Sequence, residues 1–501
     1  MFEISKLISL TLRKQLVNDM NKKLLLSISV IIFIAKVSSA QQLDLGVATS
    51  SHSRINSMYI NPANIADSQE KITINIIGAG ISADNNLGTI SSFSNLGRSF
   101  TGNSSQAVFA NSGRQNFSMM APEVDIHGPS LIYSINKKHS LAITTGLRVM
   151  NQFNNFNQSL YSTLTNTASL PNTTNTYSAQ KFNWTANMWN EVGLSYGGVI
   201  IDRPGTQLKV GVTVRRLGGI GYMSVKGNNL DINYTAGSDS FYSSHSDLEF
   251  ASSIVSNKEA VFNGVNASNL LSSFLGGSAG SGMGADLGII YSHCFGDDVT
   301  GATGSDVHNL SLSAAVKDIG AIKYSQNANA MINVTGNGYL TGQGLSNNVG
   351  DASSFKNYIS RQGFTADTQA SATKLHMPTA LILSADYQLH NHFYVNATFL
   401  GNLADRQNFG NAYYNQFTIT PRYDTRLITI GLPIAYSWLA NDIKMGFAFR
   451  ISGFFIGSND MMALFANHQY GFSAYCGGYI PIKFKKVKRL EEHDHWERFV
   501  Q

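Results

Sequence analysis

The sequence predicts an all-β protein, a transmembrane antiparallel β-barrel. Three observations favour this fold: segments in which apolar and polar residues alternate, few charged residues, and no apolar run after the N-terminal leader that is long enough to be a membrane helix. Charged residues make up only 13% of the chain and glycine reaches 45 residues, whereas soluble surfaces are about a quarter charged or more. A membrane barrel explains this composition, because its apolar residues alternate along strands and do not cluster.

Residues 1–40 are expected to form a signal peptide, with Met20 as a candidate start. Two lysines precede a 12-residue apolar run at 24–35, which is too short to cross a bilayer as a helix. Small residues then predict cleavage between Ala40 and Gln41. The alternative is a short buried helix.

Residues 41–70 contain the sequence NPANIAD and precede the first expected strand, 71–82. Asn61 is a good helix N-cap and Pro62 suits the first helical position, so Asn61, Pro62, Ala63 and Asn64 predict one short helical turn. Two interpretations stay open. The motif is a plain turn, or it belongs to a compact hatch folded into the mouth of the barrel.

Residues 71–484 are expected to form the barrel. In the stretch 208–216, Leu208, Val210, Val212 and Val214 share one face of a strand, and small or polar residues share the other. Similar alternation recurs at 141–149, 192–196, 287–291, 310–316, 381–387, 393–399, 428–438 and 443–452. A soluble sandwich would also alternate, but the apolar faces hold almost no charge and tend to end on Tyr or Trp, which favours a membrane wall.

The connections predict loops of unequal length. The stretches 83–116 and 151–183 are rich in Ser, Asn, Thr and Gly and are expected to be long loops. The inserts 236–280 and 340–374 allow short amphipathic helices, in SDLEFASSIVSNKEAVF, ASNLLSSFL and DASSFKNYISRQGF. Pro433 lies inside a strand, where it forfeits a ladder hydrogen bond, so we expect a bulge there. Residues 485–501 form a charged C-terminal tail.

Strand parity assigns eleven charged residues to the lumen. They are Arg148, Glu191, Lys209, Arg215, Asp286, Lys317, Asp386, Arg422, Asp424, Lys444 and Arg450. Seven are basic and four are acidic. One interpretation is that they pair across the barrel and make it rigid. The other is a mildly cationic lumen in which Arg215 and Arg450 attract an anionic head group.

The sequence predicts no enzyme. Gly276–Gly280 matches the nucleophile pattern G-x-S-x-G, but no strand precedes it and no helix follows it. No catalytic residue, cofactor or metal ligand is expected. Removing the leader takes away most of the formal charge of +5, so no nucleic-acid partner is implied. Cys294 and Cys476 are too few for a disulfide framework, although a mutual bridge is open.

The NPANIAD element resembles the Asn-Pro-Ala element in the N-terminal hatch of FadL-type outer-membrane transporters. The phrases GADLGIIY, LSLSAAVKDIGAIKYS, MPTALILSADYQL, TPRYDTRLITIGLPIAYSW, FFIGSND and AYCGGYIPIKF are similar to an uncharacterised Bacteroidota outer-membrane barrel family related to FadL and PorV. The resemblance implies a barrel of about 14 strands, within a range of 12–16, and an N-terminal plug. It implies no established substrate. The chain departs from the pattern by extending 17 residues beyond Phe484, since such barrels usually end on an aromatic residue.

Three function classes follow. The first is a FadL-like passage or binding site for small hydrophobic or amphipathic molecules in the bacterial outer membrane. The second is a PorV-like scaffold or shuttle for secreted proteins. The third, a barrel-embedded lipid-modifying enzyme, is disfavoured because no Ser and His can be placed together. The expected partners are therefore outer-membrane lipid and either a small hydrophobic ligand or a secreted protein.

Overall fold

The computed structural model describes residues 44–90, 109–111, 115–165, 174–238, 240–253, 279–295, 309–325, 330–349, 351–369, 372–462 and 470–484. The expected leader, its cleavage site at Ala40 and Gln41, and the tail 485–501 lie outside these residues. Ser278 of the G-x-S-x-G match lies outside them too.

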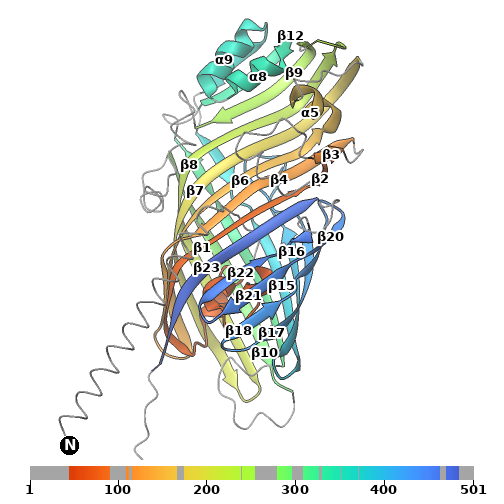
Figure 1. The fold of residues 1–501 in the computed structure, drawn as a ribbon. Coiled ribbons are helices and arrows are strands. Elements are labelled where there is room, and N and C mark those ends of the chain that lie inside the picture. Colours follow the sequence, from red (N-terminus) through yellow and green to blue (C-terminus); the bar gives the residue numbers. More distant parts are fainter. Residues whose placement is uncertain are drawn as a thin grey trace, which may run out of the picture.

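Fourteen antiparallel staves close into one barrel, where a stave is one complete crossing of the wall, made by one strand or by two strands in line (Figure 1). This confirms the predicted fold class and strand number. Ten staves are single strands: β1 (Glu70–Asn85), β6 (His139–Asn157), β7 (Asn175–Arg203), β8 (Thr206–Tyr234), β10 (Gly280–His293), β11 (Leu310–Tyr324), β16 (Phe393–Asn402), β17 (Gln416–Asp424), β22 (Phe454–Ser458) and β23 (Gly471–Lys483). The other four consist of two strands each: β4 (Asn116–His127) with β5 (Ser130–Ser134), β14 (Thr373–His376) with β15 (Ala380–His390), β18 (Ile428–Gly431) with β19 (Ile434–Ser437), and β20 (Asp442–Met445) with β21 (Phe447–Ile451). Pairing of β1 with β23 closes the wall.

The sheet continues beyond the barrel at one end. β7 and β8 are 29 residues long, whereas about ten residues suffice to cross a bilayer. β8 pairs with β10 along Thr206–Gly219 and with β9 (Ser240–Ser252) along Met223–Tyr234. β9 then pairs with β12 (Ala330–Thr341), and β12 with β13 (Thr365–Gln369). We call this part the extension.

Helices lie with the extension at the same end of the barrel (Figure 1). They are α5 (Gln158–Thr165), α8 (Gly342–Asn348) and α9 (Ala352–Arg361), and a separate two-stranded sheet is formed by β2 (Gly88–Ile90) and β3 (Phe109–Asn111). The helix predicted in DASSFKNYISRQGF is confirmed by α9. The predictions of a loop over 151–183 and a helix from Ser246 were wrong, because β6 and β7 extend into the former and β9 occupies Ser246–Ser252.

The outer face of the wall is apolar. Leu194, Val214, Leu287 and Ile443 are 59%, 45%, 52% and 60% exposed, although they alternate with buried polar residues. Tyr196, Tyr291, Tyr387 and Trp438 are also exposed, near the strand ends. Exposed apolar rows flanked by aromatic residues are the exterior of a barrel that sits in lipid. None of the helices in the described residues is long and apolar enough to cross a membrane.

The wall is interrupted at Pro433, as its missing N–H predicts. β18 ends at Gly431 and β19 begins at Ile434. The neighbouring stave breaks at Gly446, whose N–H donates to the Pro433 carbonyl at 2.8 Å.

Candidate functional site

The N-terminal segment, residues 44–68, lies inside the barrel. It contains α2 (Leu45–Ala48), α3 (Arg54–Ser57) and the 3₁₀ turn η1 (Pro62–Ile65). The Asn61 side chain caps η1 by accepting from the Ala63 N–H at 2.9 Å, and Pro62 takes the first helical position. Asn64 lies at the same turn and donates to the Ser57 carbonyl at 2.9 Å. The predicted helical turn is therefore present.

Glycines in the wall leave room for η1. An added Cβ at Gly211 would lie 2.2 Å from the Ala63 nitrogen, and one at Gly288 would lie 1.9 Å from the Asn61 Oδ1. Asn61 also donates from Nδ2 to the carbonyls of Ile289 and Ala314, at 3.1 and 3.2 Å. The turn η1 therefore packs closely against β8 and β10 at these glycines, and hydrogen bonds attach it to β10 and β11.

The same segment reaches the opposite side of the barrel. Ser50 Oγ donates to Asp424 Oδ1 at 2.8 Å. Tyr479 of β23 donates to the His52 carbonyl at 3.1 Å. α2 packs against β18, β21 and β22. Residues 44–68 therefore span the lumen between its two sides.

Buried charges from six staves, those containing β4, β6, β7, β8, β10 and β11, meet in one cluster. Arg215 forms ion pairs with Asp286, with Asp318 at 3.1 Å and with Glu191 at 3.4 Å. Arg148 lies 3.1 Å from the other Asp318 oxygen and 3.5 Å from Asp125. This central cluster places two guanidinium groups around one carboxylate that is 1% exposed.

The N-terminal segment touches the central cluster directly. Lys317 Nζ donates to the Tyr59 carbonyl at 3.0 Å. The Tyr59 ring stacks on His127 with centroids 3.6 Å apart, and His127 lies 3.3 Å from Asp125. Burial raises the pKa of Tyr59 above its ordinary value, so the hydroxyl stays neutral.

Other charges form smaller groups along the wall. Arg422 binds Asp386, with Nη2 to Oδ2 at 2.7 Å, and Asp424 at 3.3 Å. Arg450 Nη2 lies 3.7 Å from Asp424 Oδ1. Two lysines pair with carboxylates outside their own strands: Lys209 with Asp67 at 3.5 Å, and Lys444 with Asp84 at 2.8 Å.

All eleven side chains that parity assigned to the lumen lie in the interior, and each has an ion-pair partner at 4.0 Å or less. Their partners include acids that the parity count left out, namely Asp67, Asp84, Asp125, Asp318 and Asp460. With these five, the acids named here outnumber the seven basic residues, and the distances favour the paired interpretation. Arg215 pairs with Asp286, and Arg450 lies 3.7 Å from Asp424.

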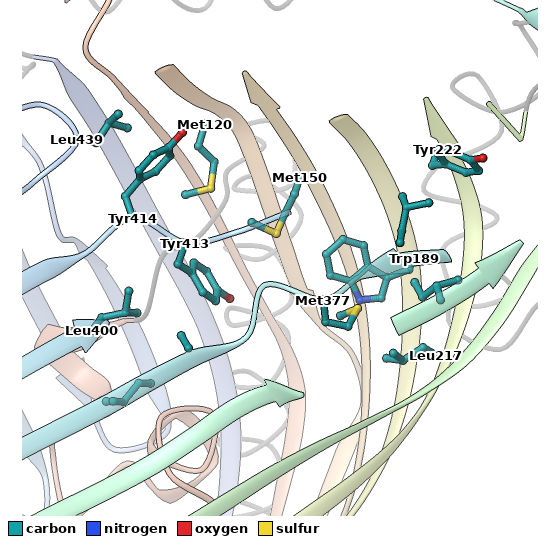
Figure 2. Close-up of a cluster of buried hydrophobic side chains, with 14 of the residues drawn as sticks. Met120, Met150, Trp189, Leu217, Tyr222, Met377, Leu400, Tyr413, Tyr414 and Leu439 are labelled. Carbon is teal, nitrogen blue, oxygen red and sulfur yellow. The ribbon is translucent and has the colours of Figure 1, made fainter. Parts of the chain in front are cut away.

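A second segment closes the interior from the other end. Residues 403–415, between β16 and β17, fold inward, and Figure 2 shows Tyr413 and Tyr414 facing Met120 and Met150 inside the wall. Gln152 holds Ala412 by two hydrogen bonds of 2.8 and 2.9 Å, and Tyr414 donates to Asn154 at 2.7 Å. Tyr413 accepts from Arg148 and donates to Asp318 at 3.1 Å. We call residues 403–415 the inner loop.

An apolar cavity lies between the extension and its helices. Its volume is about 530 Å³. Its lining is aromatic and aliphatic, apart from Ser246 and Gly342: Phe153, Phe156, Leu160, Tyr161, Phe182, Trp184, Val225, Leu230, Ile232, Phe241, Leu248, Val334, Leu340, Leu345, Val349, Phe355, Ile359 and Phe364. We call this space the apolar cavity.

Burial raises the pKa of Asp460, in the connection between β22 and β23, to about 6, although Lys444 lowers it. The folded chain therefore binds the Asp460 proton more tightly than the unfolded chain does. The contribution of Asp460 to the free energy of unfolding falls as pH rises from about 4 to 6. Asp460→Asn is expected to be more stable than the parent at pH 7 by roughly 2 kcal/mol, with little difference at pH 4. Urea unfolding in micelles at both pH values tests this, with exposed Asp202→Asn as control. Equal stabilities at pH 7 would contradict it.

No disulfide joins Cys294 and Cys476, so the mutual bridge is absent. Within the described residues, no group of three or more His, Cys, Asp or Glu side chains is placed to hold a metal ion.

Residues 62–459 match the family of unknown function DUF5723. The chain belongs to that family. No curated protein matches its sequence.

Solved structures match most of the length of the DUF5723 chain, but with low TM-scores. The toluene transporter TbuX of Ralstonia pickettii is 11% identical over 87% of this chain and 98% of its own, with a TM-score of 0.39. A mutant of the monoaromatic hydrocarbon channel TodX is 8% identical over 85% and 92%, with a TM-score of 0.40. A FadL homologue of Pseudomonas aeruginosa is 12% identical over 88% and 96%, with a TM-score of 0.27. These likenesses carry no information on what the DUF5723 chain binds.

Sequence reasoning missed Asp318 for a structural reason. A β-bulge lets Lys317 and Asp318 both oppose the single residue Asp286, and Asp318 adopts a positive φ of 55°. Both side chains then point inward, although strict alternation sends one of them to the lipid face. The signal available in the sequence was an Asp-Ile-Gly run inside an apolar strand.

Proposed function

We propose that this protein is an outer-membrane barrel that binds small hydrophobic or amphipathic molecules and passes them inward. The apolar cavity is the observation that supports this proposal. Ligand sites of this kind are typically 300–1,000 Å³ and mostly apolar, and a space of about 530 Å³ suits one small ligand. Export would use the leader at 1–40, and residues 44–68 would act as the hatch.

The ends of the barrel suggest which way the cavity faces. Tight turns join β7 to β8 and β15 to β16 at one end, whereas the extension and its helices project from the other (Figure 1). Outer-membrane barrels place short turns in the periplasm and long connections outside. The cavity would therefore take up ligand from the outside.

Passage would require movement. The inner loop and the N-terminal segment both occupy the interior below the cavity, and both are tied to the central cluster. The protein would hold ligand in the cavity until one of these segments shifts.

Ligand binding to the cavity can be tested with a matched pair of variants. Val225 lines the cavity, and Val214 on the same strand faces lipid at 45% exposure. Because the larger indole would fill the cavity, Val225→Trp is expected to weaken binding of the apolar probe N-phenyl-1-naphthylamine at least tenfold, and Val214→Trp to leave it unchanged. Probe fluorescence is titrated with the barrel in lipid nanodiscs.

Trp184 offers an independent signal, since it lines the cavity and stacks on Phe153 at 5.5 Å. Its emission should change when decanoic acid or decane binds, and Trp184→Phe should remove that change. Equal probe binding by both valine variants would contradict the proposal. Retention of a secreted protein in place of the probe would favour the scaffold function.

A further inference from the structure

A second cavity lies at the end of the barrel opposite the extension, between the N-terminal segment and the wall. Its volume is about 310 Å³. Its charged side chains are Arg54, Glu70, Arg426, Arg450 and Lys483, and His52 lies among them. Arg54 and His52 belong to the N-terminal segment, and the other four come from strand ends and the β17–β18 turn. We call this space the basic rim pocket.

The lining is strongly unbalanced in charge. Four basic side chains, Arg54, Arg426, Arg450 and Lys483, face it, against the single carboxylate of Glu70. Arg450 is partly balanced by Asp424 behind it, at 3.7 Å, and Glu70 already accepts a hydrogen bond from Thr73 at 2.6 Å. Within the described residues, neither Arg426 nor Lys483 forms an ion pair. The charges that line the pocket therefore give it a positive potential.

The donors divide into two kinds. Arg450 uses its N–H groups on Thr429 and on the carbonyls of Thr425, Arg426 and Ser452, so it supplies charge but no further hydrogen bonds. A guanidinium group carries five N–H donors. Arg426 donates one of them to the Gln69 side chain, at 3.1 Å. The other N–H groups of Arg426 and the Lys483 ammonium group can therefore donate to a ligand.

Hydrogen bonds within the N-terminal segment fix the Arg54 side chain. It is 6% exposed, and its two terminal nitrogens donate to the carbonyls of Ala66, at 2.9 Å, and Asp67. A cation fixed in this way needs no reordering to receive a negative group, which lowers the entropic cost of binding.

We propose that the basic rim pocket binds a phosphate-type oxyanion. Guanidinium and ammonium groups around a small cavity are the donor set that recognises phosphate oxygens. The anion would bridge Arg54 of the N-terminal segment to Arg426 and Lys483 of the wall, and so hold the segment in the lumen. The site is distinct from the apolar cavity and does not depend on the function proposed for it.

The first test uses inorganic phosphate on the full-length barrel in nanodiscs of phosphatidylcholine. Phosphate is expected to raise Tm by several degrees over sodium chloride at equal ionic strength. Arg426→Gln and Lys483→Gln change exposed residues. Each should weaken phosphate binding, so that the half-saturating phosphate concentration rises at least tenfold. Lys138→Gln, at an exposed turn paired with Asp202, is the matched control and should behave as the parent.

A second arm identifies the source of the phosphate group. Native mass spectrometry from phosphatidylglycerol nanodiscs should show retained lipid in the parent and less in Arg426→Gln if the ligand is a lipid head group. Phosphate-dependent stabilisation without retained lipid indicates a free oxyanion. Either result supports the site. The proposal would be overturned if the parent showed neither effect, or if Arg426→Gln and Lys483→Gln both responded to phosphate as the parent does.

Discussion

Asp318→Ala is expected to destabilise the barrel by about 3–5 kcal/mol, the range for removing one member of a buried ion pair. Asp318 is 1% exposed and accepts from Arg148, Arg215 and Tyr413 at 3.1 Å each, with Lys317 at 3.9 Å. Removing its carboxylate leaves two guanidinium groups and an ammonium close together in the interior. Repulsion between them then adds to the lost attraction.

Urea unfolding in micelles, followed by tryptophan emission, measures this loss. Arg148 lies over the Trp189 ring at 5.0 Å, so one of the four tryptophans reports from beside the cluster. The control is Asp202→Ala, which removes an exposed pair with Lys138 at 3.0 Å and should cost less than about 1 kcal/mol. If both variants lose the same stability, the central cluster does not stabilise the interior.

Gly211→Ala is expected to release the N-terminal segment while the barrel still forms. The new methyl group would lie 2.2–2.6 Å from backbone atoms of Pro62 and Ala63, so no side-chain rotation relieves the contact. Overpacking of this kind typically costs 1–3 kcal/mol, and each 1.4 kcal/mol changes an opening equilibrium tenfold. Amide hydrogen exchange of residues 45–66 should therefore become about 10 to 100 times faster.

The comparison for this variant is Gly284→Ala on the neighbouring strand β10. Its methyl group would meet neighbours at 3.4 Å or more, an ordinary contact, so exchange at 45–66 should stay at the parental rate. The strands of both variants should remain protected. Unchanged exchange in Gly211→Ala would show that η1 does not rest tightly on the wall.

Much of the wall could be predicted because its determinants are local. Alternation places Val214 toward lipid and Arg215 inward, and both lie there. The Asn61–Pro62 pair specifies its turn by an N-cap bond within two residues. Such features need only neighbouring residues, since strand geometry repeats every two positions.

What occupies the lumen was decided by the tertiary structure. The partners of Arg148 and Arg215 depend on the bulge that turns Asp318 inward, and a bulge arises from pairing between strands. The inner loop reads as an ordinary polar connection, yet Tyr413 is buried against residues more than 250 positions away. The apolar cavity likewise needs five strands and three helices from separate parts of the chain. The sequence by itself thus determined the barrel and its two faces, whereas long-range register and packing decided which charges meet, how the interior is closed and where an apolar ligand could bind.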